Sequence, residues 1–226
     1  MLEKYEKKWN IQFVAKDTVL VSYPKSGRTW LRMILATILD LSGVDVSKFE
    51  IIPAFHYTPK EMISYIGRDV KIVFLHRDPG DVILSLYASM KSSTRGDAKL
   101  GVFYRGKVGS FLRGTAYYFD EPTRLLSGWE QNGYGLDKVI EYNNIWNRQI
   151  KNFKNFMVIR YEDLHKNGLE TIREFLDWIG FDCDDEIIKK ALQLSNLENM
   201  KKIEHGEGKN NLEHYKGNFG KTIYSV

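Results

Sequence analysis

The fold is decided by the stretch Ser22-Tyr-Pro-Lys-Ser-Gly-Arg-Thr-Trp30, which joins an apolar run to an amphipathic one. Before it, Asp17–Tyr23 is a β-branched run typical of a buried strand. After it, apolar residues at helical spacing predict a helix that ends near Gly43: Trp30, Met33, Ile34, Ile38 and Leu41. Strand, glycine-containing loop and helix together predict the opening unit of a parallel α/β fold.

The same alternation occurs twice more along the chain. The strand predicted at Val70–Leu75 leads into a helix predicted at Asp81–Met90, with Asp78 placed to cap it. The strand predicted at Phe156–Arg160 is followed by a helical pattern at Leu169–Ile179. Three such units predict an α/β protein with a central parallel β-sheet flanked by helices on both faces.

The length of 226 residues favours a single domain spanning 1–226, at roughly 150 residues per domain. Within it, the segment 91–135 departs from the alternating pattern, with eight glycines, many basic residues and interleaved aromatic residues. Long irregular segments inside a domain are often functional lids. We predict that this segment is a lid over a bound ligand, suited to an anionic, glycan or aromatic compound. A solvated loop whose aromatic residues pack on the sheet is the alternative.

Composition narrows the class of protein. No run approaches the ~20 apolar residues that span a bilayer, so no membrane span is expected. The single cysteine, Cys183, excludes an internal disulfide framework, and the first residues lack the apolar core of a signal peptide. We therefore expect a cytoplasmic protein. The net charge of +4 favours an anionic ligand, while no helix shows the one-sided basic stripe of a nucleic-acid binder.

The loop after the first strand has the chemistry of an anion site. Backbone N–H groups at a helix N-terminus point outward, and the helix dipole favours negative charge there. Lys25 and Arg28 add positive charge, Ser26 and Thr29 add hydroxyl donors, and Gly27 allows close approach of the backbone. The loop is no Walker A motif, because its lysine precedes the glycine. An ordinary βα turn is the alternative to an anion site.

The sequence Tyr-Pro-Lys-Ser-Gly-x-Thr-Trp resembles the 5′-phosphosulfate-binding loop of sulfotransferases that use 3′-phosphoadenosine 5′-phosphosulfate (PAPS). In that family the lysine contacts the bridging region of the donor, the Ser-Gly-x-Thr segment holds the 5′-phosphate, and the tryptophan packs on adenine. The resemblance assigns these donor-binding roles to Lys25, Ser26, Gly27, Arg28, Thr29 and Trp30. Many relatives have a small hydroxyl residue at the position of Arg28.

A second motif, Arg77-Asp-Pro-Gly-Asp-Val-Ile-Leu-Ser85, resembles the 3′-phosphate motif of the same family. Arg77 follows the predicted strand and Ser85 lies about two turns into the next helix, so both can reach one phosphate. Ser85 is also expected to restrain Lys25. The two motifs together predict a P-loop-like phosphosulfate-binding unit of strand, loop and helix.

Weaker matches extend the resemblance over most of the chain. Tyr161 falls in a Tyr-Glu-Asp segment in which the family's tyrosine lines the adenine side. Ser195 and Leu197 match a stretch beside the adenine, and Lys216 and Gly217 match a segment that reaches the 3′-phosphate. The resemblance implies PAPS as co-substrate and adenosine 3′,5′-bisphosphate (PAP) as product. No metal is expected, because no histidine or cysteine pair has metal-ligand spacing.

Sulfonate transfer needs a base that takes the acceptor's proton, and histidine is the usual candidate near neutral pH. Of the five histidines, His56 lies 21 residues before Arg77, similar to the separation of base and arginine in the family. His76 is expected to pack at a strand end or to cap the turn. The remaining histidines are expected at the surface or in loops: His165, His205 and His214.

We therefore predict a PAPS-dependent sulfotransferase that sulfonates a hydroxyl or amine of a small-molecule or glycan acceptor. Its predicted catalytic residues are Lys25, which stabilises the leaving phosphate, His56 as general base, and Ser85. A P-loop nucleotide kinase or other phosphotransferase is one alternative, because it shares the strand–loop–helix opening. A non-catalytic module that binds adenosine bisphosphate is the other.

Overall fold

The structure is a computed structural model that describes residues 6, 12–46, 48–65, 69–85 and 136–204. The predicted lid at 91–135 and the predicted donor-binding residues Lys216 and Gly217 lie outside this part of the chain. The strands are β1 Gln12–Phe13, β2 Thr18–Ser22, β3 Phe49–Glu50, β4 Ala54–Phe55, β5 Lys71–His76 and β6 Phe156–Arg160. The helices are α2 Arg28–Leu41, α3 Pro59–Tyr65, α7 Leu136–Gln149, η3 Ile150–Asn152, α8 Tyr161–Lys166, α9 Gly168–Ile179, α10 Asp185–Leu194 and α11 Leu197–Glu204.

A four-stranded parallel sheet in the order β4-β2-β5-β6 forms the centre of the molecule. β2 lies inside the sheet, and all five of its residues are buried. Its register sets Thr18 opposite Lys71 of β5 and Leu20 opposite Ala54 of β4. A strand that is covered on both faces needs a continuous apolar run, which is the pattern found at 17–23. The predicted parallel α/β sheet is confirmed.

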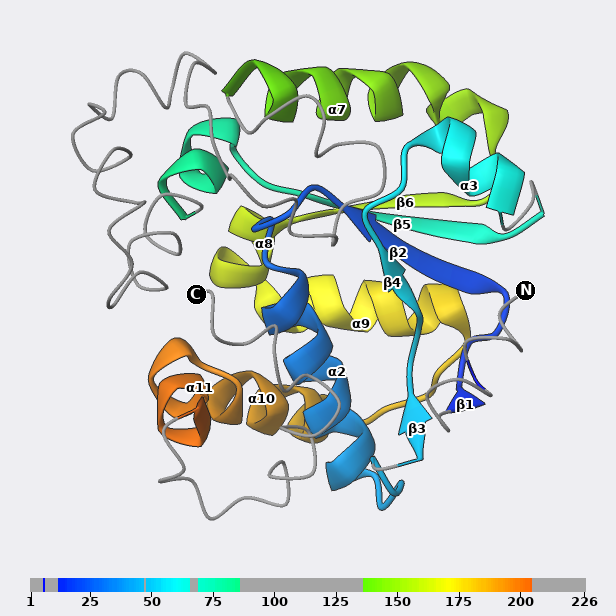
Figure 1. The fold of residues 1–226 in the computed structure, drawn as a ribbon. Helices are drawn as coiled ribbons and strands as arrows, with labels where there is room; N and C mark the ends of the chain where they lie inside the picture. The colour runs from blue at the N-terminus through cyan, green and yellow to red at the C-terminus, as the bar shows by residue number, and fades with distance from the viewer. Residues whose placement is uncertain (1–5, 7–11, 47, 66–68, 86–135, 205–226) are drawn as a thin grey trace.

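Helices cover both faces of this sheet (Figure 1). α2, α9 and α10 lie on one face and α3 and α7 on the other. Successive residues of a strand point to opposite faces, so Leu20 packs in the cluster with α2, while Val19 and Val21 pack in the cluster with α7. β5 divides its side chains in the same way, with Val73 toward α2 and Phe74 toward α7. The sheet is therefore the shared wall of two apolar cores.

The predicted helix boundaries follow from local backbone chemistry. α2 ends at Leu41, and Gly43 has a φ of +79°, a left-handed conformation that glycine adopts without side-chain strain. The Val44 N–H donates to the Leu39 carbonyl at 2.9 Å, which closes the last turn. Asp78 caps the helix over residues 79–85, because its Oδ1 accepts hydrogen bonds from the Gly80 and Asp81 amides at 2.8 and 3.1 Å.

Helix α7 was not foreseen from the sequence, although its buried face has a helical spacing. Val139, Tyr142 and Trp146 are fully or almost fully buried against the sheet. The Tyr142 hydroxyl and the Trp146 indole N–H both donate to the Tyr57 carbonyl, at 3.0 and 3.1 Å. α7 thereby fixes the segment between β4 and α3, which also carries His56.

Replacing Trp146 with a smaller residue should therefore destabilise the protein, because its side chain packs in the core. We expect Trp146→Ala to lower the free energy of unfolding by about 3–5 kcal/mol, because it leaves a large cavity beside Phe74 and removes the bond to Tyr57. Trp146→Phe should lose less. Asn147→Ala, at an exposed position of the same helix, should stay within about 0.5 kcal/mol of the wild type in urea unfolding. A loss below about 1 kcal/mol for Trp146→Ala would contradict this packing.

Candidate active site

A cavity of about 420 Å³ opens where the parallel strands end. His56, Arg77 and Tyr161 each follow directly after the last residue of a strand: β4, β5 and β6. Carboxyl ends of parallel strands meet at one edge of the sheet, so three segments far apart in sequence deliver these side chains to one place. The cavity is lined by Pro24, Lys25, Gly27, Arg28, Thr29, Trp30, His56, Arg77, Ser85, Tyr161, His165, Leu192, Asn196, Leu197 and Met200.

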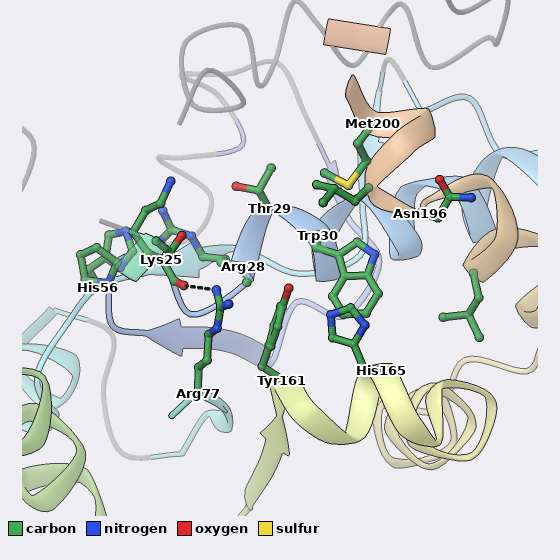
Figure 2. A pocket seen from close by; sticks show the side chains of 15 residues that line it. Lys25, Arg28, Thr29, Trp30, His56, Arg77, Tyr161, His165, Asn196 and Met200 are labelled. Atoms are coloured by element: carbon green, nitrogen blue, oxygen red, sulfur yellow. Dashed lines mark hydrogen bonds between the residues drawn. The ribbon is translucent and has the colours of Figure 1, made fainter. Parts of the chain in front are cut away.

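The cavity has a cationic end and an aromatic end (Figure 2). Lys25, Arg28 and His56 gather at the first, and Trp30 and His165 lie toward the second. Arg77 and Tyr161 stand between the two groups, and Asn196 and Met200 close the aromatic end. The arrangement suits an elongated ligand that is anionic along one part and flat and apolar along another.

The loop between β2 and α2 adopts a left-handed conformation twice. Lys25 has a φ of +69° and Gly27 a φ of +94°, and the Ser26 N–H donates to the Tyr23 carbonyl at 3.3 Å. These turns place Gly27 as the N-cap of α2 without a side-chain cap hydrogen bond from it. The first amides of α2 thus lack an intrahelical partner, and the first residues of α2 line the cavity, which is the arrangement of an anion site.

Tyr161 packs the loop against the end of β6. A Cβ on Gly27 would lie 2.3 Å from a ring carbon of Tyr161, so only glycine fits there. The same ring lies 4.1 Å from the Arg77 guanidinium carbon, a cation–π contact. Arg77 in turn donates to the Lys25 carbonyl at 3.1 Å. Its Nε is buried and has no hydrogen-bond partner in the described part of the chain, so one donor is left for a ligand.

His56 is held as a neutral imidazole. Its Nδ1 lies 2.7 Å from the Ser22 carbonyl, and because a carbonyl can only accept, Nδ1 carries the hydrogen. Burial, followed by the positive charge of Arg28, lowers the pKa of His56 well below its usual 6.5. The remaining ring nitrogen, Nε2, is then unprotonated at neutral pH and able to accept a proton.

Trp30 is fixed by a pair of buried polar groups. Its indole N–H donates to the Ser195 carbonyl at 2.7 Å, and the Ser195 hydroxyl lies 3.1 Å from that of Thr37. Ser195 is fully buried behind the indole and does not line the cavity. The His165 ring covers Trp30 at 4.4 Å between centroids, and the Tyr161 ring meets it edge-on at 5.3 Å.

Comparison with known proteins identifies the family of this chain. The sulfotransferase domain family matches residues 51–219, about three quarters of the chain. This chain belongs to the sulfotransferase family. It is 23% identical to cytosolic sulfotransferase 16 of Arabidopsis thaliana over 85% of its own length, and it spans 62% of the length of that relative. It is also 23% identical to sulfotransferase 2A6 of Mus musculus, covering 90% of this chain and 71% of the relative.

Solved sulfotransferase structures share the fold. Mouse sulfotransferase SULT7A1 complexed with PAP has a TM-score of 0.56 at 21% identity, covering 85% of this chain and 68% of that one. Retinol dehydratase in complex with androsterone and inactive cofactor PAP has a TM-score of 0.51 at 17% identity. The match covers 95% of this chain and 73% of the dehydratase chain. These likenesses confirm the α/β fold expected of a sulfotransferase.

Most of the predicted site residues of this sulfotransferase domain come together on the cavity wall. These are Lys25, Gly27, Arg28, Thr29, Trp30, His56, Arg77, Ser85, Tyr161 and Leu197. Ser26 and Ser195 are buried behind the wall, so any contact of Ser26 with an anion is through its backbone. Leu197 is 51% exposed at the aromatic end. The eight-residue separation of Arg77 and Ser85 does bring both side chains to the cavity.

The structure agrees with the expected positions of two histidines. His76 ends β5, with its Nδ1 buried and unpaired among the described residues. His165 is exposed at the surface of α8, and it also lines the cavity, which was not expected. Its position four residues after Tyr161 places both on one face of the helix, a spacing that could have indicated its role. Asn196 and Met200 share the same four-residue spacing and were also missed.

Within the described ranges, no helix is long and apolar enough to cross a membrane. The same ranges hold no group of three histidine, cysteine or acidic side chains placed to bind a metal ion.

The stability effect of the contact between Gly27 and Tyr161 can be measured separately from the effect of backbone strain. Gly27 and Gly43 both have a positive φ, but a Cβ on Gly43 would meet nothing within 4 Å. We expect Gly43→Ala to cost about 1–2 kcal/mol from strain alone. Gly27→Ala should cost a further 1–3 kcal/mol or so in urea unfolding, since the methyl group must displace the Tyr161 ring. Equal losses in the two variants would show that the ring yields freely.

Proposed function

We propose that this protein transfers a sulfonate group from PAPS to a hydroxyl or amine of an acceptor. The observation that carries the proposal is the neutral His56, with its free Nε2, in the same cavity as an anion site built by α2, Lys25 and Arg77. A base for the acceptor and a cradle for an anionic leaving group are the two elements that sulfonate transfer requires.

The cavity fits the donor. The first amides of α2, with Thr29 and the backbone of Ser26 and Gly27, would hold the 5′-phosphate. Arg77 has a buried unpaired Nε, and with Ser85 it would hold the 3′-phosphate. The adenine would lie at the aromatic end, lined by Trp30, Tyr161, His165, Leu197 and Met200, with Ser195 holding Trp30 in place. Lys216 and Gly217 are proposed to complete the 3′-phosphate contacts.

Each catalytic side chain has one task. The donor supplies an activated sulfonate group. The Nε2 of His56 accepts the proton of the acceptor hydroxyl, while the Ser22 carbonyl keeps the ring oriented through Nδ1. The ammonium group of Lys25 offsets negative charge on the departing phosphate, and Ser85 restrains Lys25 or the 3′-phosphate.

We propose a small molecule or a glycan as the acceptor, with segment 91–135 as its lid. Structural neighbours include complexes of retinol dehydratase with androsterone and with retinol, which supports a small molecule. Plant relatives are named cytosolic sulfotransferases, and we propose the cytoplasm for this chain too. The whole chain 1–226 is proposed to act as one domain.

Two substitutions test the chemistry directly. We expect Lys25→Ala and His56→Ala each to reduce sulfonate transfer by about 10²–10⁴-fold, measured with PAPS labelled in the sulfonate against a panel of phenols, alcohols and sugars. PAP should still raise the melting temperature of His56→Ala, because the donor contacts remain. Lys48→Ala, at an exposed lysine, should behave like the wild type.

The outcomes separate the candidate functions. Binding of PAP without transfer to any member of the panel would favour the non-catalytic module. Tighter binding of ATP with Mg²⁺ than of PAPS in isothermal titration would favour a phosphotransferase. Native transfer rates in His56→Ala would exclude His56 as the base.

The pKa of His56 predicts how activity depends on pH. Only the neutral ring accepts a proton, and its pKa lies well below 6.5, so kcat/KM should stay level as the pH falls through 6.5. The free energy of unfolding should decrease below that pH, because the unfolded chain then binds a proton that buried His56 does not. Profiles of kcat/KM and of urea unfolding from pH 5 to 8 test both effects. An acid limb of kcat/KM at or above about pH 6.5 would contradict the first.

A further inference from the structure

We propose that Arg28 binds an anionic group of the acceptor, so that the acceptor carries a carboxylate or sulfate beside the hydroxyl that is modified. This inference rests on the proposed function and adds a substrate class to it. Arg28 lines the cavity at the same end as His56, where the acceptor hydroxyl must lie (Figure 2).

Arg28 has no protein partner within the described ranges. It makes no hydrogen bond or ion pair there, whereas Arg32, one turn further along α2, is bonded to Glu50 through both Nε and Nη2. Glu50 is the acidic group that attracts Arg28, and the nearby Arg32 repels it more strongly. Two arginines thus share the field of one carboxylate, and that carboxylate is bonded to Arg32.

The environment of Arg28 disfavours its positive charge. Burial, followed by repulsion from Arg32, lowers the pKa of Arg28 to about 9, although the group remains charged at pH 7. A guanidinium has five N–H donors in a planar fork that matches the two oxygens of a carboxylate or the oxygens of a sulfate. An anion bound in the cavity would satisfy those donors and offset the charge.

The donor does not need this side chain. Lys25, Arg77 and the first amides of α2 already face the phosphates in the proposed arrangement, and the contribution of residue 28 to the 5′-phosphate is its backbone N–H. The Arg28 side chain instead acts on His56, whose pKa its charge helps to lower. A group that is close to the base and not required by the donor is placed to bind the acceptor.

Binding measurements on the PAP complex test this without requiring turnover. The probes are the three hydroxybenzoate isomers and the corresponding hydroxybenzamides, which share a phenol and differ in charge. We expect the best hydroxybenzoate to bind the wild-type PAP complex about 10- to 100-fold more tightly than its amide in isothermal titration. Arg28→Thr should remove that preference and lower the affinity for PAP by a smaller factor, since the backbone amide of residue 28 is kept.

Two further variants make the result specific. Arg28→Lys keeps the charge but loses the fork, so it should retain part of the preference for the acids. Arg148→Thr removes an equal charge from an exposed position of α7 and should change nothing. If Arg28→Thr lowers the affinity for PAP as much as it lowers the affinity for the hydroxybenzoates, the side chain serves the donor and the proposal fails.

The failure of this proposal is distinguishable from that of the proposed function. A wild-type chain that binds neither PAP nor PAPS would defeat the proposed function. A wild-type chain that binds PAP, but binds the hydroxybenzoates and hydroxybenzamides with equal affinity or binds no hydroxybenzoate, would defeat only the proposed role of Arg28.

Discussion

The parallel pairing of β2 with β4 and β5 is the constraint on which the site depends. Because both neighbours run in the same direction as β2, their last residues end at one edge, next to the loop that enters α2. His56 and Arg77 reach the cavity only through this register. A shift of one residue in either pairing would turn the apolar side chains of that strand to the wrong core, so the two buried clusters fix the register.

Several positively charged groups meet at that edge of the sheet and determine the electrostatic field in the cavity. The α2 N-terminus, Lys25, Arg28 and Arg77 together produce a local positive field within a chain whose net charge is only +4. The field favours anions in the cavity, while burial, followed by the charge of Arg28, lowers the pKa of His56 and keeps its ring neutral. In the proposed reaction, this positive edge would serve two needs of sulfonate transfer, binding of an anionic donor and a base that is unprotonated at neutral pH.

At the aromatic end of the cavity, contacts between neighbouring elements hold the side chains in place. Trp30 belongs to the first turn of α2, yet its orientation is set by the Ser195 carbonyl, 165 residues away in sequence. Ser195 in turn is anchored to Thr37 within α2. This small polar network ties α2 to the start of α11 inside an apolar core, where unpaired polar groups would be costly.

Local features were predictable because they depend on residues near one another in the chain. The apolar run of β2, the cap at Asp78, the helix end near Gly43 and the glycine-containing loop before α2 all follow from short spacings. Tertiary structure alone decided that His56 bonds to Ser22, that Ser195 faces inward, and that His165 covers Trp30. It also decided that Arg28 lies at the same end of the cavity as His56, while Arg32 binds Glu50. These contacts join elements whose separation in the chain carries no periodic signal, so packing and strand register determine them.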